Sequence, residues 1–202
     1  MSLAFALGIL GGLTTLVYIA PQLLSNTYVQ STYDKRWYNV KKGPFQEKAA
    51  DTLAHLREKL EVLIKYILEK DDEHDWHSQI RQINLNELRE AEEHINHVAY
   101  TINKGEAMYF CLRKDGKDDG EINSDMNTLV YVAIHEMAHV VTKTIGHTAE
   151  FWENQERLLK YASQCEIYTP INYENNSVSY CGVPLQYTCL LYTSDAADES
   201  VG

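Results

Sequence analysis

The sequence has little positive charge and few cysteines. Lys and Arg number 18 against 29 Asp and Glu, which gives a formal net charge of −11. Nucleic-acid binding depends on Lys and Arg at phosphates, so without a basic stripe we expect no direct nucleic-acid binding. The three cysteines before residue 189 form no CxxC pair. We therefore predict unpaired core thiols and a reducing compartment. These cysteines are Cys111, Cys165 and Cys181.

Residues 3–24 contain no charged side chain and are long enough for one membrane-spanning helix. No basic segment precedes this apolar run, and no small-residue cleavage site lies at a suitable distance, which favours an uncleaved anchor. The alternatives are a cleaved signal peptide and, disfavoured by the three glycines of the run, a buried core helix. Lys and Arg follow the run and do not precede it. The positive-inside rule therefore predicts a single-pass anchor with the main domain on the cytoplasmic side.

Composition divides the 202-residue chain into four parts. We predict a transmembrane anchor over residues 1–24, a juxtamembrane linker over 25–44 and one folded domain over 45–188. Residues 189–199 match the translation of a transposase adapter used to prepare sequencing libraries. Residues 189–202 are therefore predicted to be a non-native tail, with the natural chain truncated near Thr188. Without the three acidic residues of that tail the net charge is −8.

Hydrophobic periodicity outlines the domain. Apolar residues at helical spacing predict an amphipathic helix over residues 46–70, and residues 80–95 are predicted to be helical in part. Residues 98–103 and 107–113 alternate around Lys104-Gly105, which predicts a β-hairpin. Residues 168–184 are rich in tyrosine and are expected to wrap the surface.

The most informative motif is HEMAH at residues 135–139. Residues four apart lie on one face of a helix, so His135 and His139 can bind one metal ion, with Glu136 beside it. The surrounding helix is apolar nearly all round and is predicted to be buried, where unpaired polar groups are costly. A zinc ion and its water would satisfy all three side chains. The alternative is two core histidines bonded to backbone carbonyls.

A third histidine follows in the connection to a second helix. The motif helix has N-cap candidates at residues 123–125 and is predicted to end at Ile145-Gly146, and Thr148 can cap the next helix. His147 would thus point back toward the motif, held by Phe151 and Trp152. Its spacing makes His147 the preferred third ligand. Two carboxylates on the second helix are the alternatives, Glu150 and Glu153.

Other polar residues are weaker candidates. Two further histidine pairs have metal-ligand spacing, but solvent-facing loops or helix ends are favoured for both. They are His74 with His77 and His94 with His97. Three tyrosines are candidates to stabilise an oxyanion or merely to pack: Tyr168, Tyr173 and Tyr180.

HEMAH together with GHTAEFW resembles the WLM and SprT-like zinc peptidases, over roughly residues 98–165. The chain looks most similar to small WLM-like proteins with an apolar N-terminal segment, from large DNA viruses of algae and marine metagenomes. The resemblance implies Zn²⁺ bound by His135, His139 and His147, with Glu136 as the catalytic carboxylate. It also implies a helix-rich, zincin-like α+β fold with a small antiparallel sheet or hairpin before the motif helix, here preceded by an N-terminal hydrophobic helix. The DNA-binding regions of the family members that act on DNA crosslinks are not visible.

The predicted function is a zinc metallopeptidase acting on a protein or peptide substrate, with Glu136 as general base toward a metal-activated water. The strand before the motif helix either aligns an extended substrate or is an ordinary sheet strand. One alternative function is a membrane-anchored zinc-binding structural or interaction protein without turnover. A weaker one is an adaptor that binds a partner through residues 46–70.

Overall fold

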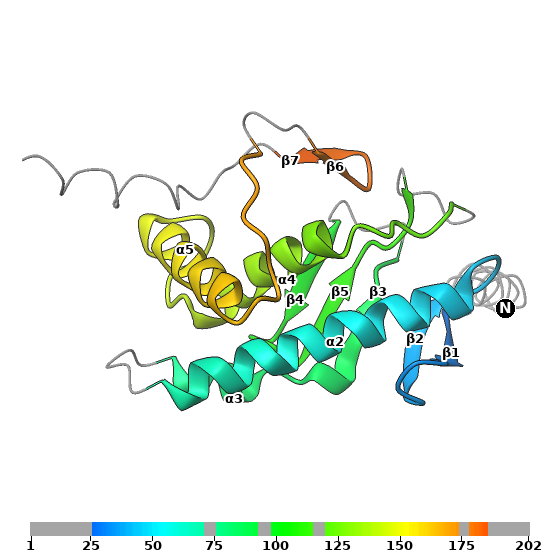
Figure 1. Ribbon diagram of the computed structural model, residues 1–202, viewed down its shortest axis with the longest axis horizontal. Helices are drawn as coiled ribbons and strands as arrows, with labels where there is room; N and C mark the ends of the chain where they lie inside the picture. Colours follow the sequence, from blue (N-terminus) through cyan, green and yellow to red (C-terminus); the bar gives the residue numbers. More distant parts are fainter. Residues whose placement is uncertain (1–25, 71–75, 93–97, 115–119, 174–177, 186–202) are drawn as a thin grey trace, which may run out of the picture.

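The computed structural model describes residues 26–70, 76–92, 98–114, 120–173 and 178–185 (Figure 1). Its helices are α2 (Gln46–Glu69), α3 (His77–Gln82), α4 (Met126–Val141) and α5 (Ala149–Gln164), with a 3-10 turn η1 (Leu85–Glu87). Its strands are β1 (Asn26–Gln30), β2 (Trp37–Lys41), β3 (Leu88–Glu90), β4 (Ala99–Ile102), β5 (Ala107–Phe110), β6 (Val178–Tyr180) and β7 (Val183–Leu185).

Five strands form one mixed sheet in the order β1-β2-β3-β5-β4. The pairs β1–β2 and β4–β5 are antiparallel, whereas β3 runs parallel to both of its neighbours. The hairpin predicted over residues 98–113 is present as β4 and β5. The sheet around it is larger than predicted and mixed. Strand β4 lies at one edge of this sheet, next to the motif helix α4 (Figure 1).

Residues 26–41, predicted to lie in a linker, form the β1–β2 hairpin. This prediction is wrong because the segment is part of the folded domain. Tyr38 and Val40 alternate into the core and are 2% and 0% exposed. The hairpin is fastened to α2 by Asp51, whose carboxylate accepts hydrogen bonds from Ser31 Oγ at 2.6 Å and Thr32 Oγ1 at 2.7 Å. The folded domain therefore begins before residue 45.

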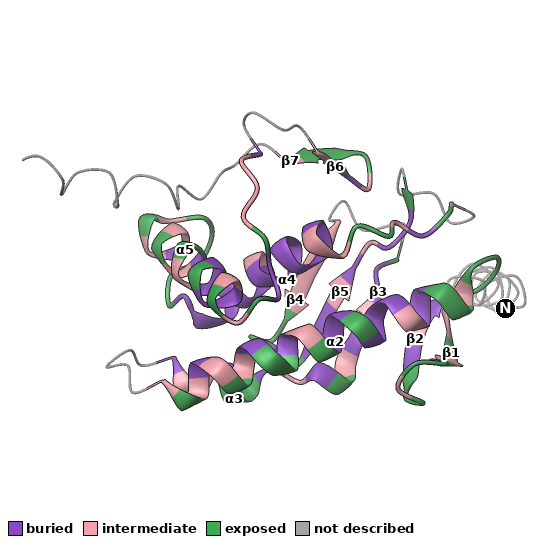
Figure 2. Ribbon diagram, viewed as in Figure 1, coloured by how far each residue is buried: buried purple, intermediate pink, exposed green. Residues whose placement is uncertain are grey.

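Helix α2 matches the helix predicted over residues 46–70 and packs along β1, β2 and β3. Helix α4 packs against β4, α2 and α5, so it is enclosed on several sides. Figure 2 shows burial along nearly all of α4 and only along one side of α2 and α5. The all-round apolar sequence of α4 thus has its predicted consequence, a helix inside the core.

The tyrosine-rich segment after α5 does not simply wrap the surface. Tyr168, Tyr173 and Tyr180 are all buried, at 5%, 1% and 1% exposure. The ring of Tyr131 on α4 contacts two of them, with centroid distances of 6.2 Å to Tyr168 and 4.7 Å to Tyr173. Aromatic burial therefore attaches this segment to the motif helix.

A disulfide joins Cys111, just after β5, to Cys181, in the turn between β6 and β7. The prediction of unpaired thiols is wrong for these two residues, and the reducing compartment inferred from unpaired thiols loses that basis. Their 70-residue separation leaves no local pattern in the sequence. Cys165 is a free thiol, as predicted.

Within the described part of the chain, no helix is both long and apolar enough to span a membrane. The predicted anchor at residues 1–24 and the predicted non-native tail at 189–202 lie outside the described residues.

Candidate metal centre

Helix α4 supplies three side chains of the centre, His135, Glu136 and His139. The helix begins at an N-cap residue, Asp125, whose carboxylate accepts a hydrogen bond from Thr128 N at 3.2 Å. It ends earlier than predicted, at Val141, because Thr142 is extended. Lys104, in the β4–β5 turn, closes this end by donating to the carbonyls of His139 and Thr142 at 2.6 and 2.7 Å. The turn of the edge hairpin thus fixes the C-terminal end of the motif helix.

The loop between α4 and α5 supplies His147. Gly146 has φ +85°, a left-handed conformation that glycine adopts without strain, as predicted, although it lies beyond the helix end. Glu150 holds the loop in place, since its carboxylate accepts hydrogen bonds from Lys143 N, Thr144 N and Thr144 Oγ1. Thr148 caps α5 as predicted, accepting from Phe151 N. These contacts turn His147 back toward α4.

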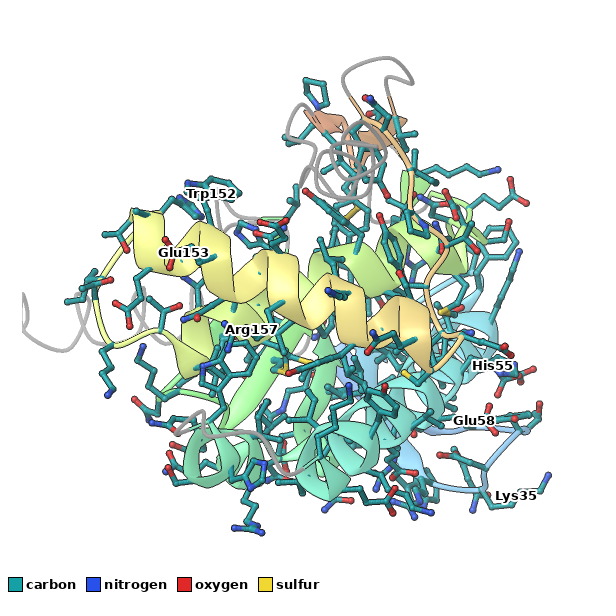
Figure 3. The ribbon with its side chains drawn as sticks, turned by 60° about the vertical axis from the view of Figure 1, so that its left-hand side comes forward. Lys35, His55, Glu58, Trp152, Glu153 and Arg157 are labelled. Atoms are coloured by element: carbon teal, nitrogen blue, oxygen red, sulfur yellow. A yellow bond between two sulfur atoms is a disulfide. The ribbon has the colours of Figure 1, made fainter. Side chains whose placement is uncertain are left out.

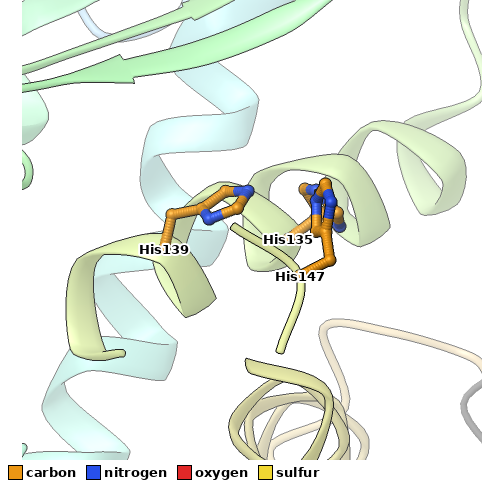
Figure 4. Close-up of side chains that lie close together, drawn as sticks. All are labelled: His135, His139 and His147. Atoms are coloured by element: carbon orange, nitrogen blue, oxygen red, sulfur yellow. The ribbon is translucent and has the colours of Figure 1, made fainter. Parts of the chain in front are cut away.

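The three histidines predicted to bind zinc come together (Figure 4). Their ring centroids form a nearly equilateral triangle, with sides of 5.0 Å for His135–His139, 5.0 Å for His135–His147 and 4.9 Å for His139–His147. One nitrogen from each ring lies within 4.8 Å of the other two. The Nε2 atoms of His135 and His147 are 3.1 Å apart, close to the roughly 3.3 Å between two nitrogens of a tetrahedral zinc site. The donor set therefore fits a zinc ion.

Phe151 forms the base of the cluster. Its ring contacts those of His135, His139 and His147, with centroid distances of 4.9, 4.4 and 4.7 Å. Trp152 stacks on His147, with centroids 5.5 Å apart and planes inclined by 26°. The predicted packing of the third histidine on these two aromatic rings is therefore present, and it restricts the orientation of His147.

Gln155 orients His135 from the buried side of α5. Its Oε1 lies 3.1 Å from His135 Nδ1, and Gln155 is fully buried. With the Gln155 amide in this orientation its oxygen accepts from Nδ1–H, which leaves Nε2 with a free lone pair for a metal. The sequence interpretation missed Gln155. The sequence does contain a clue to its role, because Gln155 is the one polar residue in the apolar stripe formed by Phe151, Leu158 and Ala162.

Glu136 lies beside the histidines and is 5% exposed. Its Oε2 accepts a hydrogen bond from Thr101 Oγ1 on β4 at 3.0 Å. Burial raises the pKa of Glu136 to about 7, although the Thr101 hydrogen bond acts in the opposite direction. A divalent cation nearby would favour the ionised carboxylate. Thr101, like Gln155, was missed by the sequence interpretation.

His135 and His139 are partly buried and favour their neutral form. Burial lowers the pKa of His135 to about 4, with smaller contributions from His139 and His147. Burial also lowers the pKa of His139 to about 4, assisted by His147 and Lys104. Neutral imidazole is the form that binds metal, so both groups are ready to act as ligands near neutral pH.

The alternative ligands do not join this cluster. Glu150 holds the loop, and Glu153 is exposed on α5 near Trp152 (Figure 3). His77 begins α3 and is not part of the three-histidine group. His74, His94 and His97 lie outside the described residues.

Of the three tyrosine candidates, Tyr180 is placed beside Glu136 by a shared pocket. It lines one pocket together with Glu136. Its hydroxyl donates to the Cys111 carbonyl at 2.6 Å. Because the hydroxyl proton of Tyr180 is engaged in this hydrogen bond, it is not directed at an oxyanion. The contact instead holds the β6–β7 hairpin in place.

Comparisons with known proteins give viral relatives of unassigned function. The chain is 29% identical over 163 residues to uncharacterized protein R325 of Acanthamoeba polyphaga mimivirus, covering 78% of this chain and 81% of that protein. It is 37% identical over 70 residues to uncharacterized protein 136R of Invertebrate iridescent virus 6, covering 35% and 38%. It is 37% identical over 76 residues to uncharacterized protein 042R of Invertebrate iridescent virus 3, covering 36% and 43%. Similarity to viral proteins was expected from the sequence.

The chain thus spans about two fifths of the length of each of the two iridescent virus proteins. No family model matches the sequence. No solved structure matches it either.

Proposed function

We propose that this protein is a zinc-dependent peptidase of the WLM/SprT-like, zincin type, acting on protein or peptide substrates. The observation that carries the proposal is the convergence of three imidazoles on one point, with a buried carboxylate beside them. A zinc ion held by these three imidazoles would supply a Lewis acid that activates a water molecule.

Each residue of the centre then has a role. His135, His139 and His147 hold the metal, and Gln155 fixes the tautomer of His135. Glu136 accepts a proton from the attacking water and delivers it to the leaving amine. Thr101 orients the Glu136 carboxylate. Phe151 supports all three rings and excludes water from beneath them.

Edge strand β4 is suited to align the substrate. It is paired with β5 on one side and ends the sheet on the other. An extended peptide can add to such an edge through main-chain hydrogen bonds. Thr101 lies on this strand and contacts Glu136, so a peptide on β4 would lie close to the proposed base.

The test is Glu136→Gln in the full chain, with Glu156→Gln on the exposed side of α5 as the matched control. Zinc content and cleavage of an unfolded protein such as casein are measured for the three proteins. We expect stoichiometric zinc in all of them and cleavage by the parent and the control alone. Equal cleavage by Glu136→Gln would reject the peptidase. Zinc binding without cleavage by the parent would favour a zinc-binding structural or interaction protein.

A further inference from the structure

A pocket of about 250 Å³ lies beside the metal centre and is lined in part by His135 and Glu136. Drug-sized ligands occupy pockets of roughly 300–1,000 Å³, so this volume suits a single amino-acid side chain better than a larger ligand. The other lining residues are Val98, Ala99, Tyr131, Val132, Tyr180, Val183 and Leu185. The pocket therefore joins the reacting centre to a mainly apolar surface.

One side of the pocket belongs to the motif helix and the edge strand. Tyr131 and Val132 precede His135 by four and three residues, so they lie one helical turn away on the side of α4 that carries the ligand. Ala99 is the first residue of β4, and Val98 directly precedes it. A peptide aligned along β4 would pass this side and present a side chain at the mouth of the pocket.

The β6–β7 hairpin forms another part of the wall, to which it contributes Val183 and Leu185. Two links fasten this hairpin to the end of β5, the Cys111–Cys181 disulfide and the 2.6 Å hydrogen bond from Tyr180 to the Cys111 carbonyl. In Figure 1 the hairpin stands apart from the main sheet. These links therefore give a small peripheral element a fixed position beside the centre.

The chemistry of the lining selects the occupant. Apart from the two residues of the centre, no lining side chain is charged. The transfer of an aliphatic side chain from water into this pocket is favourable. An acidic side chain would lose its hydration without gaining a cationic partner, and it would face Glu136. We propose that this pocket is a specificity site that takes a medium-sized aliphatic side chain, such as leucine, from a residue flanking the scissile bond. The proposal rests on the proposed peptidase function.

The test measures binding and cleavage separately in the zinc-loaded full chain. The binding probes are short peptidyl hydroxamates that chelate the metal and differ only in the adjacent side chain, which is Leu, Gly or Asp. We expect the Leu probe to bind about 10–100-fold more tightly than the Gly and Asp probes. Leu185→Arg should remove this preference and tighten the Asp probe, because it places a cation in the wall.

The control is Val62→Arg on the exposed side of α2, which makes the same kind of change away from the pocket and should leave the order of affinities unchanged. Equal affinities of the Leu and Asp probes, or absence of binding by all three, would overturn the proposal.

Cleavage of a mixed peptide library separates the two proposals. A Leu preference in binding without any cleavage would reject the peptidase, and with it the role in cleavage, and would retain the pocket only as a binding site for an aliphatic side chain. Cleavage without side-chain preference would retain the peptidase and reject the pocket.

Discussion

Thr101 on the edge strand donates a hydrogen bond from Oγ1 to Glu136 Oε2 on the motif helix, across 3.0 Å. This contact connects the element proposed to align the substrate with the residue proposed to move the proton. It also stabilises the charged form of Glu136, because a hydrogen bond to a carboxylate lowers its pKa.

The first prediction concerns this hydrogen bond. Thr101→Val should raise the pKa of Glu136, so the acidic limb of the pH–activity profile should move to higher pH. Activity near neutral pH should fall by about tenfold, in keeping with the loss of a hydrogen bond to a charged group. Thr101→Ser keeps the hydroxyl and should restore the parent profile. An unchanged acidic limb in Thr101→Val would contradict the role given to Thr101.

The second prediction concerns the partner of His135. Gln155→Leu removes the acceptor for Nδ1–H and should lower zinc affinity by about 10–100-fold. Gln164→Leu is the matched control, since Gln164 ends the same helix and its Oε1 accepts from Tyr66 instead. Competition with a chromophoric chelator measures both affinities. Equal zinc affinity in Gln155→Leu and the parent would show that the contact does not orient the ligand.

The third prediction tests the identity of the third ligand. His147→Ala should lower zinc content as much as His139→Ala does, because both remove one of three converging nitrogens. His55→Ala is the control, since His55 lies on α2 against Tyr33. Zinc per protein is measured by elemental analysis after gel filtration. Stoichiometric zinc in His147→Ala would show that another side chain supplies the third ligand.

The parts of this structure that local spacing determines could be predicted from the sequence. The four-residue spacing of His135 and His139 placed them on one helix face, and Phe151 and Trp152 indicated how His147 would be held. The helix over residues 46–70 and the hairpin around Lys104-Gly105 follow from periods of 3.6 and 2 residues. Each of these patterns is complete within a short stretch of chain.

The missed features depend on contacts between distant segments. Strand β2 pairs in parallel with β3, which lies about 50 residues later in the chain. No periodicity in residues 25–44 predicts this pairing. Arg113 and Glu90 form a fully buried ion pair with Nε and Oε1 2.7 Å apart, although both residue types are normally exposed. Gln155 and Thr101 acquire their roles only when α5 and β4 meet α4. The sequence thus indicated the three histidines that converge, and the structure was needed to find the residues that contact and orient them.

The fourth prediction concerns the disulfide. Peptide mapping without reduction should recover Cys111 and Cys181 in one cross-linked pair and Cys165 as a free thiol. Cys111→Ser with Cys181→Ser should lower the free energy of unfolding by about 2–4 kcal/mol, because the bond closes a long loop in the unfolded chain. Cys165→Ser is the control and should change it much less. Urea unfolding measures the stability of the parent, the double variant and the control. Equal stability of the double variant and the control would contradict the cross-link.

The last prediction is a pH dependence of stability in the metal-free protein. The pKa of Glu136 is about 7 in the folded state and about 4.5 in the unfolded chain. Between these values the folded state holds a proton that the unfolded state has lost, so this group lowers stability as pH rises from 4.5 to 7. Glu136→Gln lacks the titration. The stability of the variant relative to the parent should therefore increase across this window, by roughly 3 kcal/mol at most.

The two partly buried histidines, His135 and His139, titrate in the opposite sense over an overlapping range. Their folded-state pKa values are about 4 against 6.5 unfolded, so the unfolded chain binds more protons and stability rises with pH between these values. Both proteins keep these histidines, so their contribution cancels in the difference between variant and parent. Urea unfolding after metal removal, at pH 4.5, 5.5, 6.5 and 7.5, gives that difference directly. A constant difference over the whole range would show that the Glu136 carboxylate is ionised in the folded, metal-free state as readily as in the unfolded chain.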